Sequence, residues 1–217
     1  MSSHNSDGRG GDGHSGDVRA SGEDAILVAV QSALASRPGV LPVARGMSHV
    51  GEHALGWMAA AGIGVIVSEL RGNDTAAARY AQAGVGAFGA HAASVVLKRI
   101  VRRPRPDHPH IAVGVSTPSR LSFPSSHATS TTAAAILLGR AAGLPPAALP
   151  AVLVAPMMLS RLVLGVHYPS DVAAGALVGA ACAVATTRSD RLAARVTPRV
   201  WRALSSSRGP MRAMGVR

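Results

Sequence analysis

The sequence has one cysteine and is poor in aromatic and charged residues. Cys182 is the only cysteine among 217 residues, which excludes a scaffold held together by disulfide bonds. Phe, Trp and Tyr make up 3% of the chain and charged residues 15%, whereas charged residues are about 25% of a typical soluble domain. Since hydrophobic residues reach 47%, the core must be built mainly from Ala, Val, Leu and Gly. Such small-residue packing is typical of helices in a lipid bilayer.

Acidic residues are also scarce. The chain has 11 Asp and Glu but 22 Lys and Arg, which gives a formal net charge of +11. An excess of this kind can indicate nucleic-acid binding. Here the basic residues lie in short clusters between apolar runs, which is typical of membrane proteins. The apolar content also excludes a disordered chain. We therefore expect an integral membrane protein whose partners are membrane lipids and not nucleic acid.

Five long segments without formal charge follow one another and predict transmembrane helices. They lie at residues 53–68, 80–97, 121–139, 141–160 and 172–187. Each is close to the lower end of the roughly 17–25 residues that a spanning helix needs. A soluble, Ala-rich helical bundle is the alternative, but five such runs in one short chain are hard to bury away from lipid.

A shorter apolar segment, residues 25–35, precedes these five. As a helix it would be roughly 16 Å long, too short for about 30 Å of hydrocarbon. We therefore expect a short interfacial helix, ended by Arg37-Pro38-Gly39. A further span would form if this helix continued to Ala44 across Arg37. The predicted fold is thus an all-α integral membrane bundle of five or six transmembrane helices.

The two ends of the chain differ from the apolar middle. Residues 1–24 are rich in Ser, Gly, Asp and His and lack an apolar run, so we expect a disordered tail and no signal peptide. Residues 188–217 contain several arginines and are expected to form a basic tail. The membrane-embedded domain then covers residues 25–187.

Six ionisable residues lie where the predicted spans end. They are Lys98, Arg105, His127, Arg161, His167 and Asp171. If the spans cross the membrane alternately, all six fall on the same face. Ionisable residues at the membrane edge are costly and usually functional. The Arg-rich C-terminal tail favours the cytoplasmic side, so we expect a multi-pass plasma-membrane protein with this set of residues at the outer face.

The chemical properties of the six residues fit together as an anion-binding site with an acid and a nucleophile or base. The three cations would repel one another unless an anion lay between them, and guanidinium groups match phosphate oxygens. Residues 124–127 predict a turn that leads into a helix, whose N-terminus favours an anion. The two histidines offer a nucleophile or base and an acid. Asp171, four residues after His167, can hold one ring nitrogen as N–H and leave the other free.

These residues resemble the three-part signature of the type 2 phosphatidic acid phosphatase (PAP2) superfamily. The matching blocks are Lys98 with Arg105-Pro106, then Pro124-Ser125-Ser126-His127, then Ser160-Arg161 with His167 and Asp171. The resemblance covers about residues 45–187. It differs at Ser126, where the family usually has Gly, so that the side chain narrows the expected site.

The resemblance implies a role for each residue. The histidine that matches His167 attacks phosphorus and forms a phospho-histidine, and the aspartate that matches Asp171 orients it. The histidine that matches His127 protonates the leaving oxygen and then activates water. The phosphoryl oxygens are held by the residues that match Lys98, Arg105, Ser125, Ser126 and Arg161. No metal and no other cofactor is implied.

Residues 98–107, 121–132 and 164–171 resemble, more narrowly, actinobacterial phosphatases that act on decaprenylphosphoryl-5-phosphoribose, a precursor of cell-wall arabinan. The leading expectation is a membrane phosphatase that hydrolyses a phosphate monoester of a polyprenyl-phosphoryl-5-phosphoribose. Polyprenyl diphosphate, phosphatidylglycerophosphate and phosphatidate are the alternative substrates. A catalytically inactive lipid-binding protein is the alternative of another class, and a vanadium haloperoxidase is disfavoured by the hydrophobic spans.

Other polar residues near the spans receive structural interpretations. Arg99, Arg102 and Arg103 are interpreted as a basic collar at a helix end. His49, His53 and His91 are interpreted as helix-packing or interfacial residues, with His91 able to approach the site.

Overall fold

The structure, a computed structural model, describes residues 20–206, with side chains as far as residue 189. Within this range every regular element is helical, and the all-α class expected from the sequence is confirmed. The elements are α1 (Gly22–Leu34), α2 (Val40–Gly51), the 3-10 turn η1 (Glu52–Ala54), α3 (Leu55–Leu70), α4 (Asp74–Val101), α5 (Ser126–Ala141), α6 (Ala148–Val163) and α7 (Pro169–Ser206). The predicted disordered tail lies almost wholly outside the described residues.

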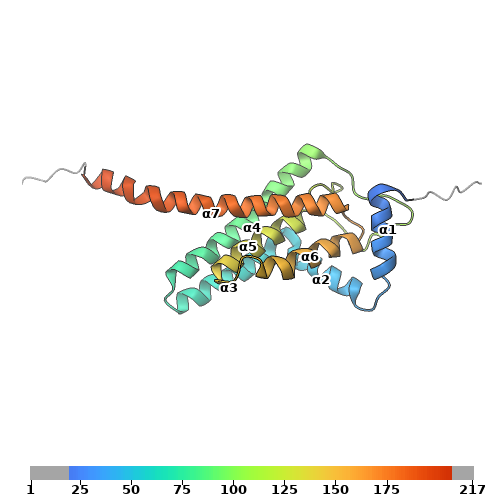
Figure 1. Cartoon of the computed structure of the whole chain (residues 1–217), viewed down its shortest axis with the longest axis horizontal. Coiled ribbons are helices and arrows are strands. Elements are labelled where there is room, and N and C mark those ends of the chain that lie inside the picture. Colours follow the sequence, from blue (N-terminus) through green and yellow to red (C-terminus); the bar gives the residue numbers. More distant parts are fainter. Residues whose placement is uncertain (1–19, 207–217) are drawn as a thin grey trace, which may run out of the picture.

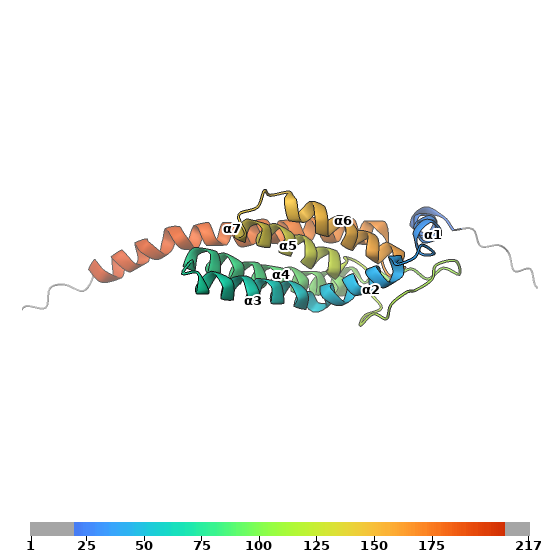
Figure 2. The same ribbon diagram turned by 90° about the horizontal axis from the view of Figure 1, so that it is seen from below.

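Helices α3 to α7 run side by side along the long axis of the molecule, and α1 crosses one end of this bundle (Figure 1, Figure 2). A side-chain cap fixes where α4 begins. Asn73 accepts a hydrogen bond from the Ala76 N–H at 3.0 Å at the start of α4, as N-cap residues do. Helix α7 continues to Ser206, so the predicted start of the basic tail at residue 188 lies inside a helix.

Helix α5 forms the buried centre of the bundle. Its buried residues are mostly Ala, Ser and Thr, and it packs against α4, α6 and α7. Gly175 and Gly179, four residues apart on α7, allow the backbone of α7 to lie close to that of α5. A Cβ atom at Gly175 would lie 2.7 Å from the Ser125 carbonyl oxygen, and one at Gly179 would lie 2.3 Å from that of Thr129. This is the small-residue packing that the composition predicts for helices in lipid.

The outside of the bundle is apolar. Large hydrophobic side chains point outward from α3, α4, α6 and α7, among them Ile63, Ile66, Val85, Phe88, Val96, Val152, Leu177 and Val184. Exposed apolar surface on this scale marks a contact with membrane or protein. Within the described residues, Val40–Leu70 and Pro169–Ser189 are long and apolar enough to cross a membrane, and Ala148–Val163 is a shorter apolar helix.

The N-terminal part differs from the expectation in one respect. The first helix ends at Leu34, and the chain turns at Gly39, which has a φ of 84°. The continuous helix across Arg37 is therefore not formed, and a separate helix, α2, begins at Val40. This helix was not predicted, because Arg45 interrupts its apolar run. A kink in η1 then joins α2 to α3, where His53 and Ala54 have φ values of 50° and 61°.

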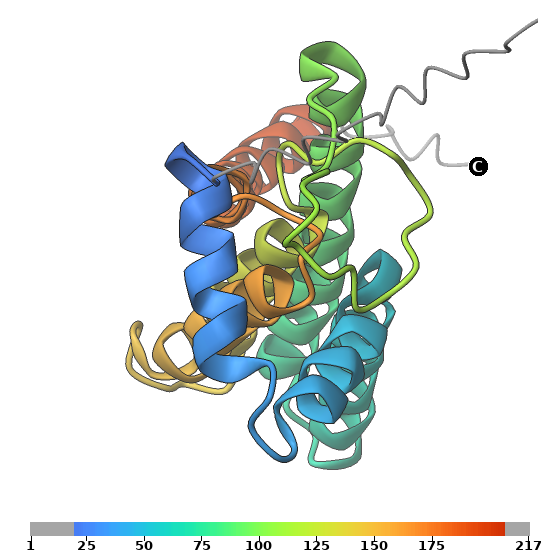
Figure 3. The same cartoon turned by 90° about the vertical axis from the view of Figure 1, so that its right-hand side faces the viewer.

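The elements that carry the motif residues meet at one end of the bundle (Figure 3). The C-termini of α4 and α6 lie there with the N-termini of α5 and α7, beside α1 and the loop of residues 102–125. Gln31 fastens α1 to this end, since its Nε2 donates to the carbonyl oxygens of Ala112 at 2.7 Å and Val163 at 3.0 Å. Four helix ends and one long loop thus surround a common space.

Candidate active site

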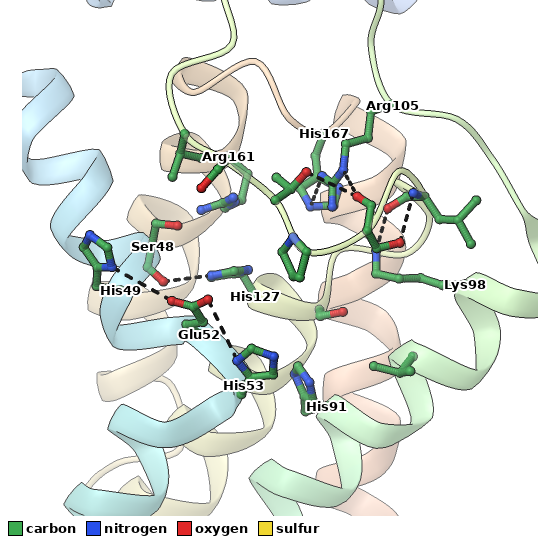
Figure 4. A pocket seen from close by; sticks show the side chains of 18 of the residues that line it. Ser48, His49, Glu52, His53, His91, Lys98, Arg105, His127, Arg161 and His167 are labelled. Carbon is green, nitrogen blue, oxygen red and sulfur yellow. Dashed lines mark hydrogen bonds and ion pairs between the residues drawn. The ribbon is translucent and has the colours of Figure 1, made fainter.

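A cavity of about 410 Å³ occupies this end of the bundle (Figure 4). Six of the predicted site residues line it: Lys98, Arg105, Ser126, His127, Arg161 and His167. Ser125 and Asp171 do not line it and are fully buried. They remain next to it, because the Ser125 N–H donates to the Asp171 carbonyl oxygen at 3.0 Å.

His167 lies in the loop between α6 and α7 and is 2% exposed. Its Nε2 is 3.3 Å from Nη1 of Arg105. Because a guanidinium can only donate, this contact requires an unprotonated Nε2 and leaves the proton on Nδ1. Burial, reinforced by the charges of Arg105, Lys98 and Arg161, holds the pKa of His167 well below its usual 6.5. The ring is therefore neutral at neutral pH, with an unprotonated Nε2 whose electron pair faces Arg105.

Asp171 lies behind His167, in the first turn of α7. Its Oδ2 is 3.7 Å from His167 Nδ1, and the same oxygen accepts a hydrogen bond from the Tyr168 N–H at 2.9 Å. Pro169 occupies the first position of the helix, where its missing N–H costs nothing. The helix start thus fixes the carboxylate on the side of the imidazole that carries the proton.

The contacts of Arg103 correct the interpretation of this residue as part of a basic collar at a helix end. Its Nη1 donates to Asp171 Oδ1 at 3.0 Å and to the Ser170 hydroxyl at 2.6 Å. Its Nη2 donates to Glu23 Oε2 of α1 at 2.5 Å, and its guanidinium lies 4.0 Å from the centre of the Tyr168 ring. Arg103 therefore joins α1 to the carboxylate behind His167, a contact between residues far apart in the sequence.

Arg105 comes from the loop that covers the cavity. Its Nε donates to the Ser119 carbonyl oxygen at 2.8 Å, and its Nη1 donates to that of Val166 at 2.6 Å. Burial lowers the pKa of Arg105 to about 10, so the group stays charged at neutral pH. The two carbonyl oxygens hold this charge beside His167.

Lys98, at the end of α4, uses all of its donors on the protein. Its ammonium donates to the carbonyl oxygens of Leu121 at 3.3 Å, Ser122 at 3.0 Å and Pro124 at 2.7 Å. An ammonium has three protons, so these bonds account for each of them. Lys98 fixes the loop that leads into α5 and adds its positive charge to the cavity.

Arg161, near the end of α6, differs from Lys98, because some of its donors have no partner among the described residues. It is 1% exposed, yet its Nε and Nη1 have no hydrogen-bond partner among the described residues. Leaving a buried charge unpaired costs several kcal/mol, and buried polar groups are almost always satisfied. Since Arg161 lines the cavity, its unused donors indicate an anionic ligand there.

The start of α5 contributes backbone and hydroxyl groups. Ser125 caps the helix, because its hydroxyl accepts from the Ala128 N–H at 3.4 Å. The N–H groups in the first turn of a helix have no partner within the helix and attract anions. The hydroxyls of Ser126 and Ser94 are 2.7 Å apart, so α4 holds the side chain that replaces the usual glycine.

His127 follows in the first turn of α5. Its Nε2 lies 2.9 Å from the carbonyl oxygen of Ser48 on α2. A carbonyl only accepts, so this contact requires a proton on Nε2. Gly51 allows the close approach of α2, since a Cβ atom there would lie 2.6 Å from Cδ2 of His127. Helix α2, missed in the sequence, thus orients this ring.

Four further residues line the cavity in a row: His49, Glu52, His53 and His91, called here the Glu52 wall. Nδ1 of His49 and Nδ1 of His53 each lie 3.9 Å from an oxygen of Glu52. The rings of His53 and His91 are 5.6 Å apart between centroids. The sequence indicates helix-packing or interfacial residues here and an approach to the site for His91 alone, which the lining by His91 confirms. The kink beside Glu52 and His53 has no sequence signal of its own.

Comparisons with known proteins agree with this geometry. Residues 79–194 match the PAP2 superfamily. The chain is 62% identical over 159 residues to the decaprenylphosphoryl-5-phosphoribose phosphatase of Mycobacterium tuberculosis, covering 73% of this chain and 85% of the relative. It is 62% identical over 154 residues to the protein of the same name from Mycolicibacterium smegmatis, covering 71% and 81%.

One solved structure has the same fold, the transmembrane PAP2-type phosphatidylglycerolphosphate phosphatase of Bacillus subtilis. Its TM-score is 0.56 at 23% identity, and the match covers 76% of this chain and 85% of that one. The motif blocks, the all-helical bundle and these matches lead to one conclusion. The chain belongs to the PAP2 superfamily.

Proposed function

We propose that the protein is a membrane phosphatase that hydrolyses a phosphate monoester of a lipid-linked substrate through a phosphorylated His167. The observation that carries this proposal is Arg161, a buried guanidinium with unused donors in the same cavity as His167 and His127. A phosphoryl group supplies the charge and the acceptors that Arg161 lacks. The family relationship supports the same class of reaction.

The first half of the reaction is carried by His167. Its Nε2 attacks phosphorus, the new N–P bond forms and the P–O bond of the ester breaks. Positive charge then develops on the ring, and Asp171 stabilises it through Nδ1–H. For this step His127 is protonated on Nδ1 as well as on Nε2, whose N–H stays bonded to Ser48. It gives the Nδ1 proton to the leaving oxygen, so the alcohol departs neutral. In the second half His127 takes a proton from water, which attacks phosphorus and releases phosphate and free His167.

The phosphoryl oxygens are held by groups that surround the nucleophile. Arg161 and Arg105 donate to them directly, and backbone N–H groups in the first turn of α5 add the helix terminus. Lys98 contributes its charge while holding the loop. Ser125 acts from behind, as the cap that orients this helix start. The protein's own cations stabilise the developing charge, and the proposed reaction uses no metal.

The substrate that we propose is a polyprenyl-phosphoryl-5-phosphoribose, from which the 5-phosphate is removed. The two curated relatives carry this specificity in their names and are 62% identical to the chain over 159 and 154 aligned residues. The Bacillus subtilis phosphatase is similar in fold alone.

For the membrane arrangement we propose that residues 25–187 form the embedded domain, that α3 to α7 are the five spans, and that α1 lies at the interface. The apolar exteriors of α3, α4, α6 and α7 support this placement. An Arg-rich cytoplasmic end of α7 would put its first turn, and therefore the cavity, at the outer face of the plasma membrane.

Phosphate release tests the function directly. Purified protein in detergent micelles should release phosphate from a phosphoribosyl polyprenyl phosphate, and a large excess of chelator should leave the rate within about twofold, because protein cations hold the phosphoryl group. The measurement is the initial rate of phosphate release with and without chelator. A full loss that one divalent metal restores would contradict the metal-free mechanism, and no release at all would favour the inactive lipid-binding protein.

Arg103→Gln should lower kcat about 10- to 100-fold with little change in KM, the usual cost of losing a group that orients a reacting residue. Arg103 contacts Asp171 and lies outside the cavity lining, so substrate binding should be spared. Arg102→Gln is the matched control, because Arg102 is exposed and next in sequence. Equal kinetic constants for the two variants would restore the interpretation as a basic collar.

A further inference from the structure

The Glu52 wall has no part in the proposed phosphoryl chemistry, yet it lines the same cavity (Figure 4). Among the described residues that line this cavity, Glu52 is the only carboxylate, and it shares the space with Lys98, Arg99, Arg105 and Arg161. A carboxylate weakens phosphate binding by repulsion wherever it approaches the anion. The cavity therefore has a cationic end and an end that disfavours phosphate.

The position of the wall relative to His127 decides which part of a substrate it faces. Ser48 bonds the His127 ring at 2.9 Å and Gly51 packs directly against it, and Glu52 is the next residue along the chain. In the proposed reaction His127 protonates the leaving oxygen. The Glu52 wall therefore faces the alcohol that leaves and not the phosphoryl group that is transferred.

The backbone is held in an unusual conformation at this place. His53 and Ala54 have positive φ angles of 50° and 61°, a backbone conformation that is strained for residues other than glycine. Such conformations persist where the surrounding structure fixes them and often occur at ligand-binding sites. Here the kink ends α2 and turns Glu52 and His53 toward the cavity.

The chemistry of the wall fits hydroxyl groups. An ionised carboxylate only accepts hydrogen bonds, and its two oxygens can accept from the two hydroxyls of a vicinal diol. The imidazoles of His49 and His53 can donate or accept. On the covering loop, Ser116 and Thr117 add further hydroxyls. A cavity of about 410 Å³ lies in the range of sites for small organic ligands, roughly 300–1,000 Å³, and holds more than a phosphate.

We propose that the Glu52 wall is a polyol subsite, in which Glu52, with His49 and His53, binds the hydroxyls of a sugar-like group between the phosphate and the lipid. This inference rests on the proposed function and adds a basis for specificity to it. A substrate whose leaving alcohol carries a vicinal diol is bound at both ends of the cavity. A lipid monophosphate without such a group is bound at the cationic end alone.

The test compares two substrates in one assay: a phosphoribosyl polyprenyl phosphate and a plain polyprenyl monophosphate. The measured quantity is kcat/KM for the phosphoribosyl polyprenyl phosphate divided by kcat/KM for the plain monophosphate. Glu52→Gln should lower this ratio about 10- to 100-fold, the effect of losing hydrogen bonds to a charged group. His49→Gln, at an exposed position that should not affect folding, should lower it less, about 2- to 10-fold. Glu69→Gln, an exposed carboxylate at the other end of α3, is the control and should leave the ratio unchanged.

Two results would overturn the subsite. Unchanged kcat/KM values for both substrates in Glu52→Gln and His49→Gln would show that the wall does not contact the sugar. A fall in both kcat/KM values by the same factor would show that Glu52 acts on the chemistry and not on selection. Failure of the unmodified protein to hydrolyse either substrate would instead overturn the proposed function, and the subsite with it.

Discussion

Replacing His167 with alanine will reduce phosphate release by about 10,000-fold or more, the scale of loss when a covalent catalyst loses its nucleophile. Nε2 of His167 lies 3.3 Å from Nη1 of Arg105 in the cavity, and the buried Asp171 carboxylate lies 3.7 Å from Nδ1, so this ring joins an unprotonated nitrogen to a supporting carboxylate beside the cations. The measurement is the initial rate of phosphate release by the purified variant. Its circular dichroism and thermal unfolding should match those of the parent.

His110→Ala provides the control for the loss of an imidazole. His110 is exposed in the covering loop and does not line the cavity, so its removal should leave the rate within about twofold. A His167→Ala protein that works at the parent's rate would show that the phosphoryl group is not transferred to this residue.

Arg161→Met should produce opposite effects on activity and stability. Activity should fall at least about 100- to 1,000-fold, as when one preorganised donor to a developing oxyanion is removed. Stability should stay the same or increase, because methionine replaces a buried charge whose Nε and Nη1 have no partner among the described residues. The measurements are phosphate release and the midpoint of thermal unfolding, each with and without added phosphate.

Phosphate should raise the unfolding temperature of the unmodified protein by mass action and should have no such effect on Arg161→Met. Arg45→Met is the control, since Arg45 is exposed and bonds only the Gly114 carbonyl oxygen, at 2.9 Å, among the described residues. A marked loss of stability in Arg161→Met, with the phosphate effect retained, would assign Arg161 to the fold and not to the ligand.

The sequence predicted the helical class and the grouping of motif residues because both follow from local patterns. Runs without formal charge mark the helices, and alternation of their ends places Lys98, His127, Arg161 and Asp171 at one end of the bundle. The structure refines the helix limits where local chemistry overrides hydropathy. Helix α6 begins at Ala148 and not at residue 141, because Gly143 and the Pro145-Pro146 pair form a turn.

The remaining features depend on contacts between distant residues. Arg103 and Asp171 are 68 positions apart, and Glu23 is a further 80 from Arg103, so no local pattern shows that they form a network. The donors of Lys98 are taken up by a loop whose path the sequence does not specify. Helix α2 was missed because Arg45 interrupts its apolar run. The kink after it and the Glu52 wall were missed because their place depends on packing against His127.

A structure of the protein with bound vanadate tests the central claim most directly, because vanadate adopts the five-coordinate geometry of phosphorus during transfer. We expect vanadium bonded to Nε2 of His167, with its oxygens within hydrogen-bond distance of the guanidinium groups of Arg161 and Arg105. Vanadate bound elsewhere, or a cavity in which Arg161 remains without an anionic partner at saturating vanadate, would contradict the assignment of this site as the centre of phosphoryl transfer.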